Sequence, residues 1–122
     1  MILSAEPQLF VSDVRAACNW FGDLGFDTVF CWGEPASYAQ VARENGRINL
    51  RHIDGPVFAP GLREREPDLL SVTFTVDDMT DLYEEFEAAG VDFHQDLRTE
   101  EWGARTFILR DADDNLILFA GS

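Results

Sequence analysis

Residues 7–27 read PQLFVSDVRAACNWFGDLGFD, and a shift of 65 places brings them onto residues 72–92, VTFTVDDMTDLYEEFEAAGVD. Each copy predicts a strand, an acidic helix cap, an amphipathic helix that ends at glycine, and a second strand. A repeat of this length that occurs only twice is typical of two fused modules rather than a solenoid, and we expect a site between them. Both copies keep the same residue at five positions, namely Val11/Val76, Asp13/Asp78, Phe21/Phe86, Gly25/Gly90 and Asp27/Asp92.

The first module spans about residues 1–54. Its first strand, Pro7 to Val11, alternates so that Leu9 and Val11 share one face while Glu6, Gln8 and Phe10 share the other. Asp13 is the expected helix N-cap and Gly25 the left-handed stop. The helix buries an apolar stripe of Val14, Ala17, Cys18, Phe21 and Leu24. Further strands are predicted at Asp27–Trp32, Tyr38–Arg43 and Arg47–Ile53.

The second module spans about residues 69–122, after a linker of about residues 55–68 in which glycines and prolines alternate with charges and no third element is expected. Asp78 caps its helix and Gly90 ends it. The run from Asp111 to Asn115 lacks the glycine and bidentate glutamate of a calcium loop and predicts a hairpin turn. Strands are predicted at Leu70–Val76, Val91–His94, Arg105–Arg110 and Leu116–Ala120, so each module is βαβββ and the class is α+β.

The chain has 122 residues and a formal net charge of -14. Such a charge disfavours nucleic acids and anionic membranes as partners; it either attracts a cationic ligand or serves solubility. No signal peptide or membrane span is recognised, so the cytoplasm is the default location. Cys18 lies on the apolar helix face and is expected to be a buried free thiol.

The stretches Phe10–Asp13, Trp20–Phe21, Leu24–Phe26 and Arg110–Phe119 resemble the vicinal oxygen chelate superfamily of glyoxalases, dioxygenases and bleomycin-resistance proteins. The resemblance implies two βαβββ modules whose sheets form a curled mixed sheet around a shared cleft. It also implies a homodimer with clefts between modules of two subunits. The segment Glu101–Phe107 is similar to the corresponding stretch of bleomycin-resistance proteins.

Enzymes of this superfamily usually hold a divalent metal with His and Glu side chains. The resemblance places those four positions at Glu6, Asn49, Ser71 and Leu118. Only Glu6 is a strong ligand for a transition metal, and Leu118 has no donor atom, so we expect neither metal nor other cofactor.

Other residues offer little chemistry. Glu6 is either a general base beside a substrate or a carboxylate paired with Arg51. His52 and His94 are expected in surface or packing roles. No phosphate-binding glycine loop, nucleophile elbow or paired-cysteine metal motif is present.

The side chains expected to face the cleft still form a coherent set. Ligand pockets combine aromatic walls with a few placed polar groups. In bleomycin-resistance proteins two aromatic side chains sandwich the flat part of the drug, and their positions fall on Tyr38 and Trp102; the alternative is that aromatic residues here belong to the core. The candidate ligand-binding residues are Phe10, Trp32, Tyr38, Gln40, Asn49, Arg51, Ser71, Trp102 and Leu118.

These observations favour a metal-independent protein of bleomycin-resistance type that sequesters a planar, cationic or zwitterionic aromatic molecule or antibiotic. The alternative is a lyase, isomerase or dioxygenase of the same fold that has relocated its metal or uses Glu6 as a base. A third hypothesis is a regulatory or immunity module whose cleft a partner fills.

Overall fold

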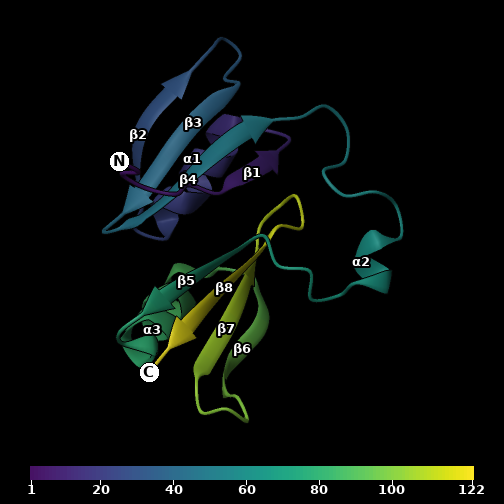
Figure 1. Ribbon diagram of the computed structural model, residues 1–122. Coiled ribbons are helices and arrows are strands. Elements are labelled where there is room, and N and C mark those ends of the chain that lie inside the picture. Colours follow the sequence, from purple (N-terminus) through teal and green to yellow (C-terminus); the bar gives the residue numbers. More distant parts are fainter. The chain divides into compact units, whose positions relative to one another are not determined.

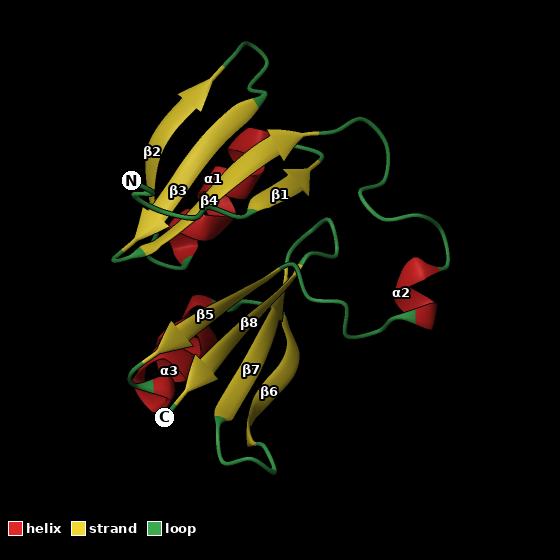
Figure 2. Cartoon of the chain, viewed as in Figure 1, coloured by secondary structure: helices red, strands yellow, loops and turns green.

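The computed structural model describes residues 1–122 and forms two compact units, Met1–Val57 and Phe58–Ser122. Each unit contains one four-stranded mixed sheet (Figure 1). In each, one long helix covers one face of the sheet (Figure 2). The repeated βαβββ pattern of the sequence is therefore present twice in the structure.

Unit 1 contains sheet A, with strand order β1-β4-β3-β2. β1 runs parallel to β4, and the other neighbours are antiparallel. Its elements are β1 Gln8–Val11, α1 Val14–Asp23, β2 Asp27–Trp32, β3 Tyr38–Arg43 and β4 Gly46–His52.

The helix of unit 1 begins and ends where the sequence predicts. The Asp13 carboxylate accepts a hydrogen bond from the Ala16 amide at 3.0 Å, which satisfies one of the free donors of the first turn. After the helix, Gly25 adopts a φ of 82°, a conformation that side chains disfavour. The buried side of α1 meets the apolar rows of sheet A, which include Leu9, Val11, Ala39, Val41, Ile48 and Leu50.

Unit 2 contains sheet B, with strand order β5-β8-β7-β6 and a parallel β5–β8 pair. Asp78 caps its long helix by accepting from the Asp81 amide at 3.0 Å, and Gly90 ends it with a φ of 76°. The elements are α2 Leu62–Arg65, β5 Val72–Val76, α3 Met79–Ala89, β6 Phe93–Thr99, β7 Arg105–Arg110 and β8 Leu116–Gly121.

The core of unit 2 is built from phenylalanines between α3 and sheet B. Phe107 and Phe119 stack with their ring centroids 5.0 Å apart, and Phe86 on α3 meets both rings edge-on. Offset and edge-to-face pairs of this kind add to the free energy gained by burial alone. The fourth ring, Phe74, stacks on Phe119 from β5.

Two predictions about unit 2 were wrong. The linker contains a short helix, α2, although its glycines and prolines suggested no element. β6 begins later and continues five residues beyond the predicted end at His94, to Thr99. Its register shifts on both sides of Gln95, and these irregularities obscure the alternation that marks a strand. None of the helices has both the length and the apolar character needed to cross a membrane.

Candidate functional site

The face of sheet A that α1 does not cover, here called the open face, carries two rows of side chains across the strands. Strand pairing aligns Phe10, Arg51, Tyr38 and Trp32 in one row. It aligns Gln8, Asn49, Gln40 and Phe30 in the next. Since residues two apart in a strand share a face, the first row and Phe30 place four aromatic rings and one guanidinium together.

These five residues, Phe10, Phe30, Trp32, Tyr38 and Arg51, form the aromatic platform. Phe30 and Tyr38 contact each other with ring centroids 5.1 Å apart. The Arg51 guanidinium lies 4.7 Å from the Tyr38 centroid, within the range of a cation–π contact. Trp32 is 70% exposed, Phe10 46% and Phe30 38%. Aromatic surface grouped in this way is unlike the isolated exposed apolar residues of an ordinary surface, and is the kind of surface on which ligands or partners bind.

A polar network occupies the second row. Gln40 donates to Glu6 and to Asn49, each at 2.9 Å, while Arg47 donates to the Gln40 carbonyl oxygen at 2.8 Å. Ser4 also donates to Glu6. The Ser4 hydroxyl, with smaller help from Asn49, Arg47 and Gln40, holds the pKa of Glu6 below its usual value, although burial opposes this. A lowered pKa makes the Glu6 carboxylate a weaker base, which does not favour a role in proton abstraction.

Of the two alternatives for Glu6, the pairing with Arg51 was wrong. Glu6 lies against Gln40 and Asn49, whereas Arg51 lies one row away on the Tyr38 ring. Arg47, which was not among the predicted site residues, supplies the positive charge that helps to lower the pKa of Glu6. The alternation of β4 places Arg47 on the same face as Asn49 and Arg51, so this alternative was present in the sequence.

The residues at the four family metal positions do not fit a transition metal. The Glu6 carboxylate and the Asn49 amide are bound to Gln40 and to each other. The Ser71 hydroxyl donates to the Asn115 side chain at 3.0 Å, and Leu118 contributes only an alkyl chain. One carboxylate with an amide, a hydroxyl and no imidazole is a weak donor set for such ions.

Unit 2 supplies the remaining predicted ligand-binding residues. Leu118 and Thr73 pair across β8 and β5, on the face of sheet B opposite the phenylalanine core. Trp102 lies in the turn between β6 and β7 and is 76% exposed. Close to it in sequence, the Arg98 guanidinium, together with the Thr106 hydroxyl, lowers the pKa of Glu100.

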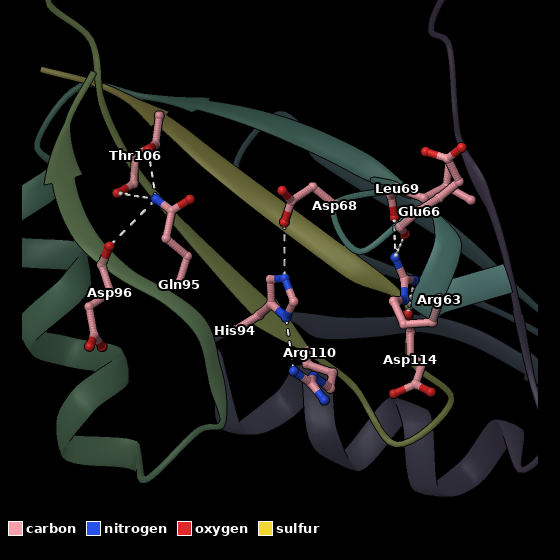
Figure 3. A network of polar contacts seen from close by, with 10 residues as sticks. All are labelled: Arg63, Glu66, Asp68, Leu69, His94, Gln95, Asp96, Thr106, Arg110 and Asp114. Atoms are coloured by element: carbon pink, nitrogen blue, oxygen red, sulfur yellow. Dashed lines mark hydrogen bonds and ion pairs between the residues drawn. The ribbon is translucent and has the colours of Figure 1, made fainter. Parts of the chain in front are cut away.

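A second polar network in unit 2 accounts for one of the two histidines (Figure 3). Arg110 can only donate, so His94 Nδ1 accepts its hydrogen bond at 2.8 Å. His94 Nε2 then donates to Asp68 at 3.2 Å. Arg63 fixes the chain on both sides of Asp68, because it donates to the carbonyl oxygens of Glu66 and Leu69. It also donates to the carbonyl oxygen of Asp114. The second histidine, His52, bonds to the Ser12 carbonyl and to Asp54. Both histidines thus have structural partners, which favours the packing roles predicted for them.

Phe30 was not among the site residues predicted from the sequence. It shares the parity of Trp32 in β2, so strict alternation would have placed both on one face. The register shift of β2 lies before Phe30, between Thr28 and Phe30, so the alternation from Phe30 to Trp32 is unbroken and this signal was present in the sequence. The pairing of Phe30 with Gln40 places Phe30 in the second row of the open face.

Comparison with known proteins supports one family. The family model of the glyoxalase/bleomycin resistance protein/dioxygenase superfamily matches residues 4–119. No curated protein matches the chain.

Solved structures of several kinds are similar to it. A bleomycin-binding protein complexed with bleomycin has 20% identity and a TM-score of 0.79, with 98% of each chain covered. A bleomycin-binding protein from bleomycin-producing Streptomyces verticillus, complexed with copper(II)-bleomycin, has 25% identity and a TM-score of 0.72, covering 100% of this chain and 98% of that one. Lactoylglutathione lyase from Agrobacterium tumefaciens has 17% identity and a TM-score of 0.71, covering 98% of this chain and 92% of that one. Binding proteins and an enzyme therefore share this fold, and the match over nearly the whole chain shows that the protein belongs to the glyoxalase/bleomycin resistance protein/dioxygenase superfamily.

Proposed function

We propose that the protein binds a planar aromatic small molecule, without a metal, in the manner of a sequestering protein of bleomycin-resistance type. The observation that carries this proposal is the aromatic platform on the open face of sheet A. Its rings present flat apolar surface, and the polar network of Glu6, Gln40 and Asn49 lies in the adjacent row. Rings beside a few polar groups are the usual lining of a small-molecule site.

Sequestration requires affinity but no reacting group. Each offset ring pair contributes about 0.5–1.5 kcal/mol beyond the area it buries. A ligand in contact with two or three rings of the platform therefore gains several kcal/mol from stacking and burial together. The donor set around Glu6 favours this proposal over a metal-dependent lyase, since the family metal positions carry one carboxylate and no imidazole, too few strong ligands for such chemistry.

Two further elements belong to the proposal. Trp102 is the candidate contact from unit 2, by its similarity to the drug-contacting tryptophan of bleomycin-resistance proteins. A homodimer is the assembly that the family resemblance implies, and light scattering after size-exclusion chromatography measures it directly.

Isothermal titration calorimetry tests the proposal with bleomycin and with simple planar aromatics such as naphthalene and quinoline derivatives. We expect at least one of them to bind, and Trp32→Ala to weaken binding about tenfold through loss of one stacking ring and its buried area. Trp102→Ala tests the contribution of unit 2 separately. Val29→Ala is a matched control because it removes another exposed apolar side chain of β2. Absence of binding across the panel, or binding indifferent to Trp32 and Tyr38 truncation, would contradict the proposal.

A further inference from the structure

The guanidinium of Arg51 is the one charged group of the aromatic platform. It lies over the Tyr38 ring at 4.7 Å, and no carboxylate of unit 1 lies within ion-pair distance of it. Other arginines of the chain have such partners, for example Arg43 with Glu44 at 3.3 Å and Arg98 with Glu100 at 2.7 Å. Arg51 therefore keeps an unneutralised positive charge in a chain that contains 23 acidic residues and 9 basic ones.

The nearby carboxylate is not available to neutralise it. Glu6 accepts hydrogen bonds from Ser4, Gln40 and Asn49, and the positive charge that acts on it is that of Arg47. These contacts lie in the second row of the open face, while Arg51 lies in the first. Moving Glu6 to Arg51 would break the bonds that satisfy the buried amides of Gln40 and Asn49.

Stacking also decides which atoms of Arg51 are free. A guanidinium carries five N–H donors in its own plane, and contact of its carbon atom with a ring face leaves those donors for other partners. The fork of two N–H groups matches the two oxygens of a carboxylate or phosphate. Phe10 and Tyr38 flank Arg51 in the row, so a flat ligand resting on the platform lies beside these N–H groups.

We propose that Arg51 binds an oxyanion, a carboxylate or phosphate, carried by the planar aromatic ligand. The inference rests on the proposed function and specifies the ligand class for that site. It also departs from what the net charge of the chain suggests. The charge of -14 favours cations at long range, but a ligand cation in contact with Arg51 meets a like charge. A zwitterionic ligand satisfies both conditions if its anionic end meets Arg51.

A matched set of three probes separates charge from ring stacking. Sodium 2-naphthoate, 2-naphthamide and 2-naphthylmethylamine carry the same ring with an anionic, a neutral and a cationic substituent. Calorimetric titration of the full chain is expected to show naphthoate binding about tenfold or more tighter than naphthamide, with the amine weakest. The preference is expected to disappear in Arg51→Gln and to survive in part in Arg51→Lys, which keeps the charge but loses the planar fork.

Arg15→Gln is the matched control. It removes the same charge from the chain, but Arg15 belongs to α1, on the covered side of sheet A, and is paired with Glu34 at 3.8 Å. The preference for naphthoate must persist in this variant. Circular dichroism checks that Arg51→Gln remains folded, which its exposed position favours.

Each outcome bears on one of the two proposals. Equal binding of naphthoate and naphthamide, tighter binding of the amine, or a naphthoate preference that survives in Arg51→Gln would overturn the oxyanion inference while leaving aromatic binding intact. If none of the three probes binds and bleomycin does not bind either, the proposed function fails and the inference fails with it. If bleomycin alone binds, the oxyanion inference fails at this site and the proposed function stands.

Discussion

Replacing Asp111 by alanine is expected to destabilise unit 2 by about 2–4 kcal/mol. Asp111 Oδ1 accepts hydrogen bonds from the backbone amides of Asp113 at 2.9 Å and Asn115 at 2.8 Å, and Oδ2 accepts from the Asn115 side chain at 2.9 Å. Asp111 is 8% exposed and Asn115 only 3%, so water cannot easily replace the carboxylate. Together these bonds close the turn between β7 and β8, confirming the hairpin predicted there.

The magnitude follows from the donors that alanine leaves behind. Each buried donor without a partner costs about 1–3 kcal/mol, and two of the three donors belong to the buried Asn115. Burial also raises the pKa of Asp111, which means that the folded chain bears a cost for the charge, and alanine relieves that part. The unfolding free energy of Asp111→Asn is expected to lie between those of the native chain and Asp111→Ala. Asparagine keeps one acceptor oxygen for the backbone amides, but its amide nitrogen would face the Asn115 amide nitrogen. If the Asn115 side chain turns over, its amide nitrogen meets the Ser71 hydroxyl, which can accept as well as donate, so part of the loss is recovered.

Urea unfolding followed by far-ultraviolet circular dichroism measures these free energies. Glu101→Ala is the control: it removes an equal charge from an exposed position of the same unit and should change stability by less than about 0.5 kcal/mol. If Asp111→Ala costs less than about 1 kcal/mol, or no more than the control, the reasoning from buried donors is refuted.

Three further outcomes are expected. In a carbon-13 NMR titration, burial should move the pKa of Asp111 above 3.8, while the Arg98 bond should move that of Glu100 below 4.5. The contribution of Asp111 to stability should then fall as the pH rises from the pKa of Asp111 in the unfolded chain through its pKa in the folded chain. The contribution of Glu100 should be lost as the pH falls from the pKa of Glu100 in the unfolded chain through its pKa in the folded chain. Shifts of opposite sign would contradict the structure. Asp78→Ala removes the cap of α3 and should lower the unfolding free energy by about 1 kcal/mol in thermal melts, so an unchanged melt would count against the cap. Burial raises the pKa of the Cys18 thiol, so iodoacetamide at pH 8 should alkylate it more slowly in the folded chain than in urea, and equal rates by peptide mass mapping would rule this out.

Much of the fold could be predicted because local signals agree with tertiary packing. Asp13 and Asp78 cap their helices as predicted, and β7 begins and ends at the predicted residues, Arg105 and Arg110. β6 could not be predicted in full because its register shifts around Gln95 break the alternation. α2 is only one turn long, and so short a helix has almost no periodicity to detect.

The sequence could predict which face of the sheet carries the site residues, but not which side chains contact one another there. Period-two alternation alone places Tyr38 and Arg51 on the open face of sheet A. The partner of each arginine depends on how the strands are aligned. In the observed alignment, a row of side chains lies between Glu6 and Arg51, so the two do not meet. The sequence carries no simple signal for that offset, since it arises from how β1, β3 and β4 align.

An NMR titration of the nitrogen-15-labelled chain with sodium 2-naphthoate most directly tests whether the aromatic platform is a binding site. The three tryptophan side chains serve as internal probes: Trp32 lies on the platform, Trp20 on α1 behind the sheet, and Trp102 in unit 2. The proposal predicts a saturable shift of the Trp32 indole signal together with backbone amides of β2, β3 and β4, while the Trp20 indole signal stays in place. A shift centred on Trp20, or no saturable shift of Trp32 at millimolar ligand, would contradict it.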